Sequence, residues 1–264
     1  ALPILEVING WYGRKDIPVG APKGYSAPRL TTSMLRTDWP GYLVSHFAHA
    51  TDSTACAPSA VETYRRVLSR QPDGSVTICT LGFFSNLKAL LASGPDRWSK
   101  LSGKDLVAKK VKLLVSMAGA FPNGYEFNVY WDADAARTVA DEWPTPIIFS
   151  GWEIGSEIFT GNAVRDLPGD ISANPIKAAY TLALSEDDRP HGRDSWDQTA
   201  ALVAIRGAAP WFTLRHGHMK VDGKGNNKWT DDPQGQHAYL VFAQPIKQVR
   251  DAIEALMTQM PRKR

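Results

Sequence analysis

Three short apolar segments constrain the fold of this chain more than any other sequence feature. They occupy residues 76–81, 112–117 and 146–150, and none of them alternates strictly between apolar and polar positions. Short apolar runs without alternation are typical of strands that are buried on both faces. Helix-like segments separate the three runs, so their order predicts an α/β fold with a mostly parallel central sheet flanked by helices.

The two ends of the chain are expected to be helical. An amphipathic pattern covers residues 2–9, and an i, i+3, i+4, i+7 stripe of apolar residues runs over 246–260. Residues 14–58 are rich in Pro, Gly, Ser and Thr without a sustained period, which predicts a long irregular segment. We find no pattern for a second core and therefore expect a single domain over residues 1–264.

The C-terminal third differs in pattern from the central part. Residues 199–206 are expected to be helical, and the Gly- and Asn-rich stretch 222–227 predicts the turn of a small β-hairpin. Residues 237–242 are apolar enough for one further strand. The predicted fold therefore ends in a small C-terminal β-hairpin, a strand and a C-terminal helix.

Composition excludes several classes of protein. The chain has 30 Lys and Arg against 27 Asp and Glu, a net charge of +3, which is too small to indicate nucleic-acid binding by charge. No apolar run approaches the roughly 20 residues that a membrane span needs. The two cysteines exclude a disulfide-rich scaffold and a four-cysteine zinc site. We expect a small-molecule ligand rather than a nucleic acid or a membrane.

The loops that follow the three apolar runs are the places to look for a site, because parallel sheets bind ligands at the carboxyl ends of their strands. In the second of these loops Glu126 and Asn128 alternate with Phe127, so both polar side chains can face one cavity. A carboxylate beside a carboxamide suits a polyhydroxyl ligand such as a sugar. The alternative interpretation is that both side chains cap the loop, and the residues alone leave both open.

Other candidate constellations are weaker. His46, His49 and Asp52 have a loose metal-ligand spacing, and a polar surface loop is the simpler interpretation. His216 and His218 fit a surface turn. The chain contains no Gly-x-Ser-x-Gly motif, which argues against a serine hydrolase of the α/β type.

Several motifs, taken in order, resemble one known family. They are Pro-Asp-Gly-Ser-Val-Thr-Ile at 72–78, Leu-Gly-Phe-Phe-Ser-Asn-Leu at 81–87, Ser-Met-Ala-Gly-Ala-Phe at 116–121, Glu-Phe-Asn at 126–128, Trp-Pro-Thr-Pro-Ile-Ile-Phe-Ser-Gly at 143–151 and Ser-Trp-Asp at 195–197. Their order and spacing over nearly the whole chain resemble the inosine–uridine-preferring nucleoside hydrolases. The stretch at 143–151 looks like a divergent, often exported branch of that family.

The resemblance implies a fold, a reaction and a set of residues. The family cleaves N-ribosidic bonds of ribonucleosides with a water activated by calcium held at the strand ends. Asp197 matches a late calcium-ligating aspartate, and the Ser85 carbonyl matches a main-chain ligand of the same ion. Glu126 and Asn128 match the ribose-binding pair. Trp152 and Trp196 are expected to form walls around the base, with Trp196 in the place of a histidine found in better-known members.

One departure from the family bears on function. The family's early Asp-x-Asp-x-x-x-Asp-Asp cluster, which supplies most calcium ligands and the catalytic base, has no counterpart in residues 1–264. The catalytic base is therefore unassigned, and we expect a domain truncated at its N-terminus relative to the family. Such a domain would associate with a second copy or a separate N-terminal segment. The alternatives are a non-catalytic homologue that binds a sugar or nucleoside, and a hydrolase of another class such as an esterase.

Overall fold

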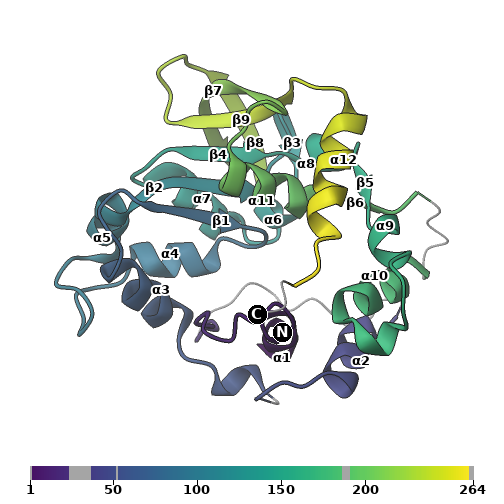
Figure 1. The fold of residues 1–264 in the computed structure, drawn as a ribbon. Helices are drawn as coiled ribbons and strands as arrows, with labels where there is room; N and C mark the ends of the chain where they lie inside the picture. Colours follow the sequence, from purple (N-terminus) through teal and green to yellow (C-terminus); the bar gives the residue numbers. More distant parts are fainter. Residues whose placement is uncertain (1, 24–36, 52, 186–190, 262–264) are drawn as a thin grey trace.

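The main element of the fold is a seven-stranded sheet with the order β1-β2-β4-β9-β7-β8-β3 (Figure 1). The computed structural model of the chain describes residues 2–23, 37–51, 53–185 and 191–261. The strands of the sheet are β1 (Val76–Thr80), β2 (Val111–Met117), β3 (Asn123–Tyr125), β4 (Ile147–Ser150), β7 (Phe212–Val221), β8 (Asn226–Asp231) and β9 (His237–Phe242). Two short strands, β5 (Phe159–Thr160) and β6 (Arg193–Asp194), form a separate antiparallel pair.

Helices surround this sheet and form a further group beside it. They are α1 (Leu2–Trp11), α2 (Trp39–His46), α3 (Ala60–Ser69), α4 (Ser85–Leu91), α5 (Gly103–Lys110), α6 (Phe127–Tyr130), α7 (Ala133–Glu142), α8 (Trp152–Gly155), α9 (Asn162–Arg165), α10 (Pro175–Ser185), α11 (Trp196–Arg206) and α12 (Ile246–Met257). No helix among the described residues is both long enough and apolar enough to cross a membrane.

The topology confirms the predicted fold class. The three apolar runs form β1, β2 and β4, which pair in parallel, and β9 joins β4 in parallel as a fourth strand. The predicted hairpin is β7 and β8, which lie antiparallel and add, with β3, an antiparallel part to the same sheet. The expected C-terminal helix is α12.

Helices cover both faces of the parallel strands, which explains the absence of polar alternation in their sequences. Leu114 and Phe149 point to one face, where they pack in a core with residues of α4, α5 and α7. Their neighbours Val115 and Ile148 point to the other face and pack against residues of α11 and α12. Successive side chains of a strand alternate between the two cores, so the middle positions of these strands are mostly apolar.

The N-terminal region departs from the sequence expectation. The prediction of an irregular segment over residues 14–58 is wrong for α2, which begins after Asp38. The Asp38 carboxylate accepts a hydrogen bond from the Gly41 N–H at 2.9 Å, and Pro40 stands in the first turn, where a proline costs no hydrogen bond. In Figure 1, α1, α2, α9 and α10 lie together below the sheet.

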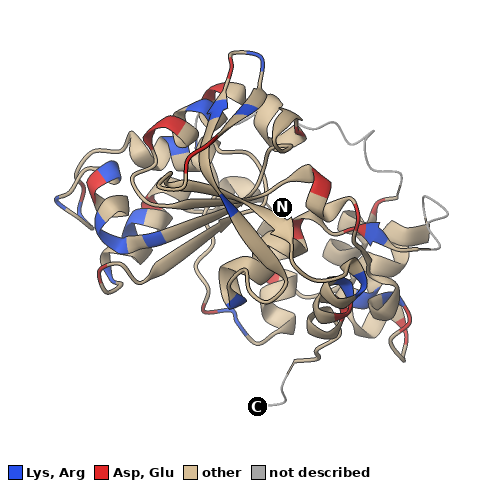
Figure 2. Ribbon diagram, turned by 90° about the horizontal axis from the view of Figure 1, so that it is seen from above, with Lys and Arg blue, Asp and Glu red and all other residues tan. Residues whose placement is uncertain are grey.

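Charged residues of both signs are mixed on the outer helices and loops (Figure 2). Many of them form surface ion pairs, such as Lys220 with Asp141 at 2.6 Å and Arg250 with Asp251 at 3.0 Å. Exposed pairs of this kind contribute little to folding individually. The stability of the domain therefore depends mainly on the two apolar cores.

We expect Leu114→Ala to lower the free energy of unfolding by about 2–5 kcal/mol, because Leu114 is completely buried and its truncation leaves a cavity. Urea denaturation followed by circular dichroism measures this loss. Ile205→Ala is the control, since Ile205 is 78% exposed, and we expect it to change stability by less than about 0.5 kcal/mol. Equal effects of the two substitutions would contradict the assignment of the core.

Candidate active site

Polar side chains gather at the carboxyl ends of β1, β2 and β4. The Thr80 hydroxyl donates to Ser116 Oγ at 2.8 Å and ties the end of β1 to β2. The hydroxyls of Ser150 and Thr199 lie 2.6 Å apart and tie the end of β4 to α11. All four side chains are buried. These hydroxyl pairs hold the first turn of α11 beside the strand ends, which is where a parallel sheet binds ligands.

Asp197 lies in this first turn of α11. Its side chain is exposed to solvent, yet desolvation by the surrounding protein raises the pKa of its carboxyl to about 6, against the opposing charge of Arg193. Neighbouring protein atoms therefore desolvate this carboxyl without covering it. The charge of Asp197 raises the pKa values of Glu126 and Cys79, so the three groups are within electrostatic reach of one another.

Glu126 is the N-cap of α6. Its Oε1 accepts a hydrogen bond from the Asn128 N–H at 2.8 Å, and its Oε2 accepts from Gly119 at 3.1 Å and from Val129 at 3.2 Å. Burial raises the pKa of the carboxyl to about 7 although these three N–H groups oppose the shift. The capping interpretation therefore describes what Glu126 does in this structure, and its 3% exposure leaves little surface for a ligand.

Asn128 has a fixed side-chain orientation. Its Nδ2 donates to the Met117 carbonyl oxygen at 3.0 Å and lies 3.2 Å from the Met117 sulfur. This contact turns Oδ1 away from Met117, and none of the described residues donates a hydrogen bond to it. Asn128 thus offers one oriented acceptor at the end of β2.

Trp152 and Trp196 are brought together by a single hydrogen bond. The Trp196 Nε1–H donates to the main-chain oxygen of Trp152 at 3.0 Å, so its only polar hydrogen is engaged. Trp196 lies tightly against Gly155, where an added Cβ would stand 2.3 Å from the Trp196 Cα. The Trp152 side chain is 51% exposed and remains available to a ligand.

Ser85 is the first residue of α4 and borders a cavity of about 360 Å³ at the end of β1. Cys79, Thr80 and Asn86 line the same cavity. Because Cys79 also experiences the charge of Asp197, the cavity and the carboxylate lie in one neighbourhood. No described hydrogen bond or ion pair joins Ser85 directly to Asp197.

The described residues do not by themselves fit a calcium ion. Calcium takes six to eight oxygen ligands, often from several carboxylates. Among residues 2–23, 37–51, 53–185 and 191–261, no group of three His, Cys, Asp or Glu side chains is arranged to hold a metal. Asp197 and the Ser85 carbonyl supply two ligands at most, and the Glu126 carboxylate is occupied by three N–H groups.

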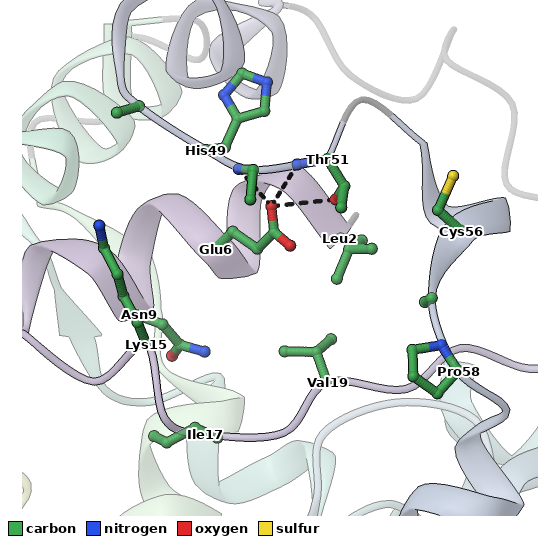
Figure 3. A pocket seen from close by; sticks show the side chains of 13 residues that line it. Leu2, Glu6, Asn9, Lys15, Ile17, Val19, His49, Thr51, Cys56 and Pro58 are labelled. Carbon is green, nitrogen blue, oxygen red and sulfur yellow. Dashed lines mark hydrogen bonds between the residues drawn. The ribbon is translucent and has the colours of Figure 1, made fainter.

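A second cavity, of about 370 Å³, lies between α1 and residues 48–51 and 56–58 (Figure 3). There Glu6 Oε2 accepts hydrogen bonds from the N–H groups of Ala50 and Thr51, both at 2.9 Å. His49 borders this cavity, and the His46 ring stacks on Tyr42 at 3.9 Å. Asp52, the third residue of the metal-ligand spacing formed with His46 and His49, lies outside the described residues. The cavity contains none of the residues predicted for the site.

Sequence reasoning missed Glu153 and Asn227, which both bind the loop after β2. In the sequence, Glu153 comes shortly after the apolar run 146–150, and this position marks it as a candidate for a site at the strand ends. Asn227 follows a turn in a hairpin, and nothing in its local sequence connects it with residue 120.

The fold and the site define an α/β protein with a polar cluster at the carboxyl ends of its parallel strands. Two solved structures are similar in fold over 97% of this chain: a plant nucleoside hydrolase (19% identical, TM-score 0.69, 85% of that chain) and a purine-preferring ribonucleoside hydrolase from Gardnerella vaginalis (14%, 0.71, 84%). The type III effector XopQ, solved with adenosine diphosphate ribose, is 14% identical with a TM-score of 0.65 over 97% of this chain and 79% of its own.

The sequence profile of the inosine-uridine preferring nucleoside hydrolase family matches residues 1–241. The chain therefore belongs to this family. An uncharacterised protein of Schizosaccharomyces pombe is 28% identical over 201 residues, which are 69% of this chain. The match spans 58% of the length of that relative.

We expect the Glu126 carboxyl to make folding stability depend on pH. Its folded-state pKa of about 7 exceeds the ordinary value of 4.5, so its contribution is fully present below about pH 4.5 and is lost as pH rises to about 7. Glu126→Gln does not titrate, and its melting temperature should fall less than that of the wild type between pH 4.5 and pH 7.5. Parallel curves for the two proteins in differential scanning calorimetry would contradict this assignment.

Proposed function

We propose that this chain hydrolyses the N-glycosidic bond of ribonucleosides. The observation that carries the proposal is the Asp197 carboxylate, which is exposed, partly desolvated and within electrostatic reach of Glu126 at the strand ends of a nucleoside hydrolase fold. A negative charge in a partly desolvated site stabilises a positive charge that develops on a bound substrate. Cleavage of a glycosidic bond develops such a charge on the sugar ring.

The proposed roles follow the geometry of each side chain. Asn128 Oδ1 accepts a hydrogen bond from a ribose hydroxyl, because its amide nitrogen is committed to Met117. The exposed Trp152 ring lies against the base, since stacking needs only a π face. Asp197 faces the ribose ring, and Glu126 holds the loop that carries Asn128.

The proposed reaction adds water across the bond between C1′ and the base nitrogen. The water oxygen bonds to C1′, the C1′–N bond breaks, and the second proton of the water ends on the departing base. Trp196 does not deliver that proton, because indole does not titrate and its N–H is bonded to Trp152. Calcium, which the family resemblance implies, needs oxygen ligands beyond Asp197 and Ser85, and no step of this reaction is assigned to it.

A non-catalytic homologue that binds a sugar or nucleoside is the second candidate. The incomplete ligand set around Asp197 favours it, because no group of three His, Cys, Asp or Glu side chains among the described residues is arranged to hold a metal. The two candidates share the binding site and differ in turnover. Binding of inosine in calorimetry without release of hypoxanthine would select the second candidate.

Asp197→Asn tests the proposed reaction. With inosine and uridine as substrates, we expect kcat/KM to fall on the order of 100-fold, since the substitution removes a charge that stabilises the transition state. Chromatographic measurement of the free base and a reducing-sugar measurement of ribose follow the reaction. Asp251→Asn is the control, because Asp251 forms surface ion pairs on α12. Wild-type rates in Asp197→Asn would contradict the role.

The proposal includes a partner at the edge of the sheet. No described residue pairs with the outer side of β1, whose sequence Val-Thr-Ile-Cys-Thr carries neither a charge nor a proline. Edge strands that remain unpaired are normally protected by charged residues, prolines or bulges. The register of β1 with β2 is irregular between Val76 and Thr77 and regular over residues 77–80. We therefore propose that a second copy of the chain or a separate segment pairs with β1.

We expect light scattering after size exclusion to give a mass above 29.0 kDa for the associated chain. Intact mass spectrometry of the same sample distinguishes a second copy from a separate segment. A strictly monomeric 29.0 kDa species with full nucleosidase activity would contradict both forms of the partner proposal.

A further inference from the structure

Three successive peptide N–H groups in the loop after β2 are each bonded by a different side chain. The Gly119 N–H donates to Glu126 Oε2 at 3.1 Å, and the Phe121 N–H donates to Glu153 Oε2 at 3.1 Å. Between them, the Ala120 N–H donates to Asn227 Oδ1 at 2.9 Å. The three acceptors come from the start of α6, from α8 and from β8. The loop is therefore held by three separate elements at the end of β2.

Asn227 is bonded to Ala120 at both of its polar atoms. It accepts from the Ala120 N–H and returns a hydrogen bond from Nδ2 to the Ala120 carbonyl oxygen at 2.8 Å. The residue is completely buried, and the register of β3 with β8 sets it opposite Gly124. Two complementary bonds fix the amide orientation and the Ala120 peptide together. Removing the side chain leaves a peptide donor and acceptor without partners in the interior, which is costly.

Glu153 holds the far end of the same loop. One oxygen accepts the Phe121 N–H, and the other is buried without a hydrogen-bond partner among the described residues. Gly151 gives the carboxylate its room, because a Cβ there would stand 2.3 Å from Oε1. The Trp152 N–H donates to the Gly119 carbonyl oxygen at 2.8 Å, so the turn that carries Glu153 contacts both ends of the loop.

The Phe121 ring completes the attachment of the loop. It stacks on Tyr239 with ring centroids 4.6 Å apart and packs edge-on against Trp229 at 5.4 Å. Tyr239 belongs to β9 and Trp229 to β8, so the antiparallel part of the sheet supports the loop from below. Backbone and side chain of Phe121 are thus both fixed.

We infer that Asn227 and Glu153 are positioning residues for the nucleoside site, an inference that rests on the proposed function. Glu126 Oε2 is located by the Gly119 N–H, and Glu126 Oε1 in turn locates the Asn128 N–H. The loop geometry is thereby transmitted to the side chain proposed to bind ribose. The C-terminal hairpin acts on the site through Asn227, although it contributes no group that touches the ligand.

Asn227→Ala tests this inference, with Asn226→Ala as the matched control. The Asn226 side chain bonds to Asp222 within the exposed turn, and no described hydrogen bond joins it to residues 118–121. We expect Asn227→Ala to raise the Kd for ribose about tenfold in calorimetry and to lower kcat/KM for inosine by about ten- to hundredfold, because small displacements of positioned groups are costly. Asn226→Ala should stay within about twofold of the wild type in both measurements.

Glu153 supplies a second, independent comparison. Glu153→Gln keeps an oxygen that accepts the Phe121 N–H, whereas Glu153→Ala removes it. A positioning role predicts that Glu153→Gln retains ribose affinity within about threefold and that Glu153→Ala loses about tenfold. Equal losses in both variants would overturn the role of Glu153.

Hydrogen exchange measures the positioning without any ligand. In Asn227→Ala we expect faster exchange at the amides of Gly119, Asn128 and Val129, and no change in Asn226→Ala. If Asn227→Ala does not fold, Asn227→Ser, whose short hydroxyl cannot make both bonds to Ala120, serves in its place. Unchanged exchange and unchanged ribose affinity in a folded variant would overturn the inference. The wild type could bind ribose without hydrolysing inosine, while Asn227→Ala still weakens ribose binding and speeds exchange. That result would contradict only the proposed hydrolysis.

Discussion

Coverage of the four parallel strands by helices on both faces is the constraint on which the rest of the structure depends. Because Leu114 and Val115 enter opposite cores, the middle of the strands has no solvated face on which a polar group can stand. Polar chemistry is therefore confined to the loops at the strand ends. There the chain must turn while its peptide groups are still buried, and each buried N–H needs an acceptor.

This requirement explains why carboxylates and carboxamides gather after β2. Glu126, Glu153 and Asn227 are the acceptors for three successive peptide groups, and they come from segments far apart in the sequence. The same groups place Asn128 and border the region influenced by Asp197. The contacts that satisfy the buried N–H groups of the loop thus also assemble the candidate site, and Glu126 takes part in both.

The sequence predicts those parts of the fold whose cause is local. The apolar runs locate β1, β2 and β4 because burial on both faces selects apolar residues at successive positions. No local sequence pattern predicts the position of β9 between β4 and β7, because strand order depends on which strands meet in space. The helix α2 was missed because it is short and begins at an Asp-Trp-Pro sequence inside a stretch rich in loop residues.

The candidate site was predictable to a smaller extent for the same reason. Alternation about Phe127 pointed to Glu126 and Asn128 as candidates, but the choice between capping and ligand binding depends on the Gly119 and Val129 N–H groups. Asp197 is 71 residues beyond Glu126 in the sequence, and only the family resemblance connected the two. The structure adds the physical link, because the Asp197 charge acts on the Glu126 carboxyl.

Trp196 shows how packing restricts the chemistry of this site. Its indole bonds to the Trp152 main-chain oxygen and fills the space beside Gly155, so it joins α8 to α11 and cannot swing toward a ligand without breaking that junction. An indole in this position supplies an apolar surface and no proton. In the reaction we propose, the main contribution is therefore stabilisation of the ribosyl cation by Asp197, and Trp196 does not protonate the departing nucleobase. A nucleobase that departs readily without a proton from the protein fits such a site better than a nucleobase that requires acid catalysis.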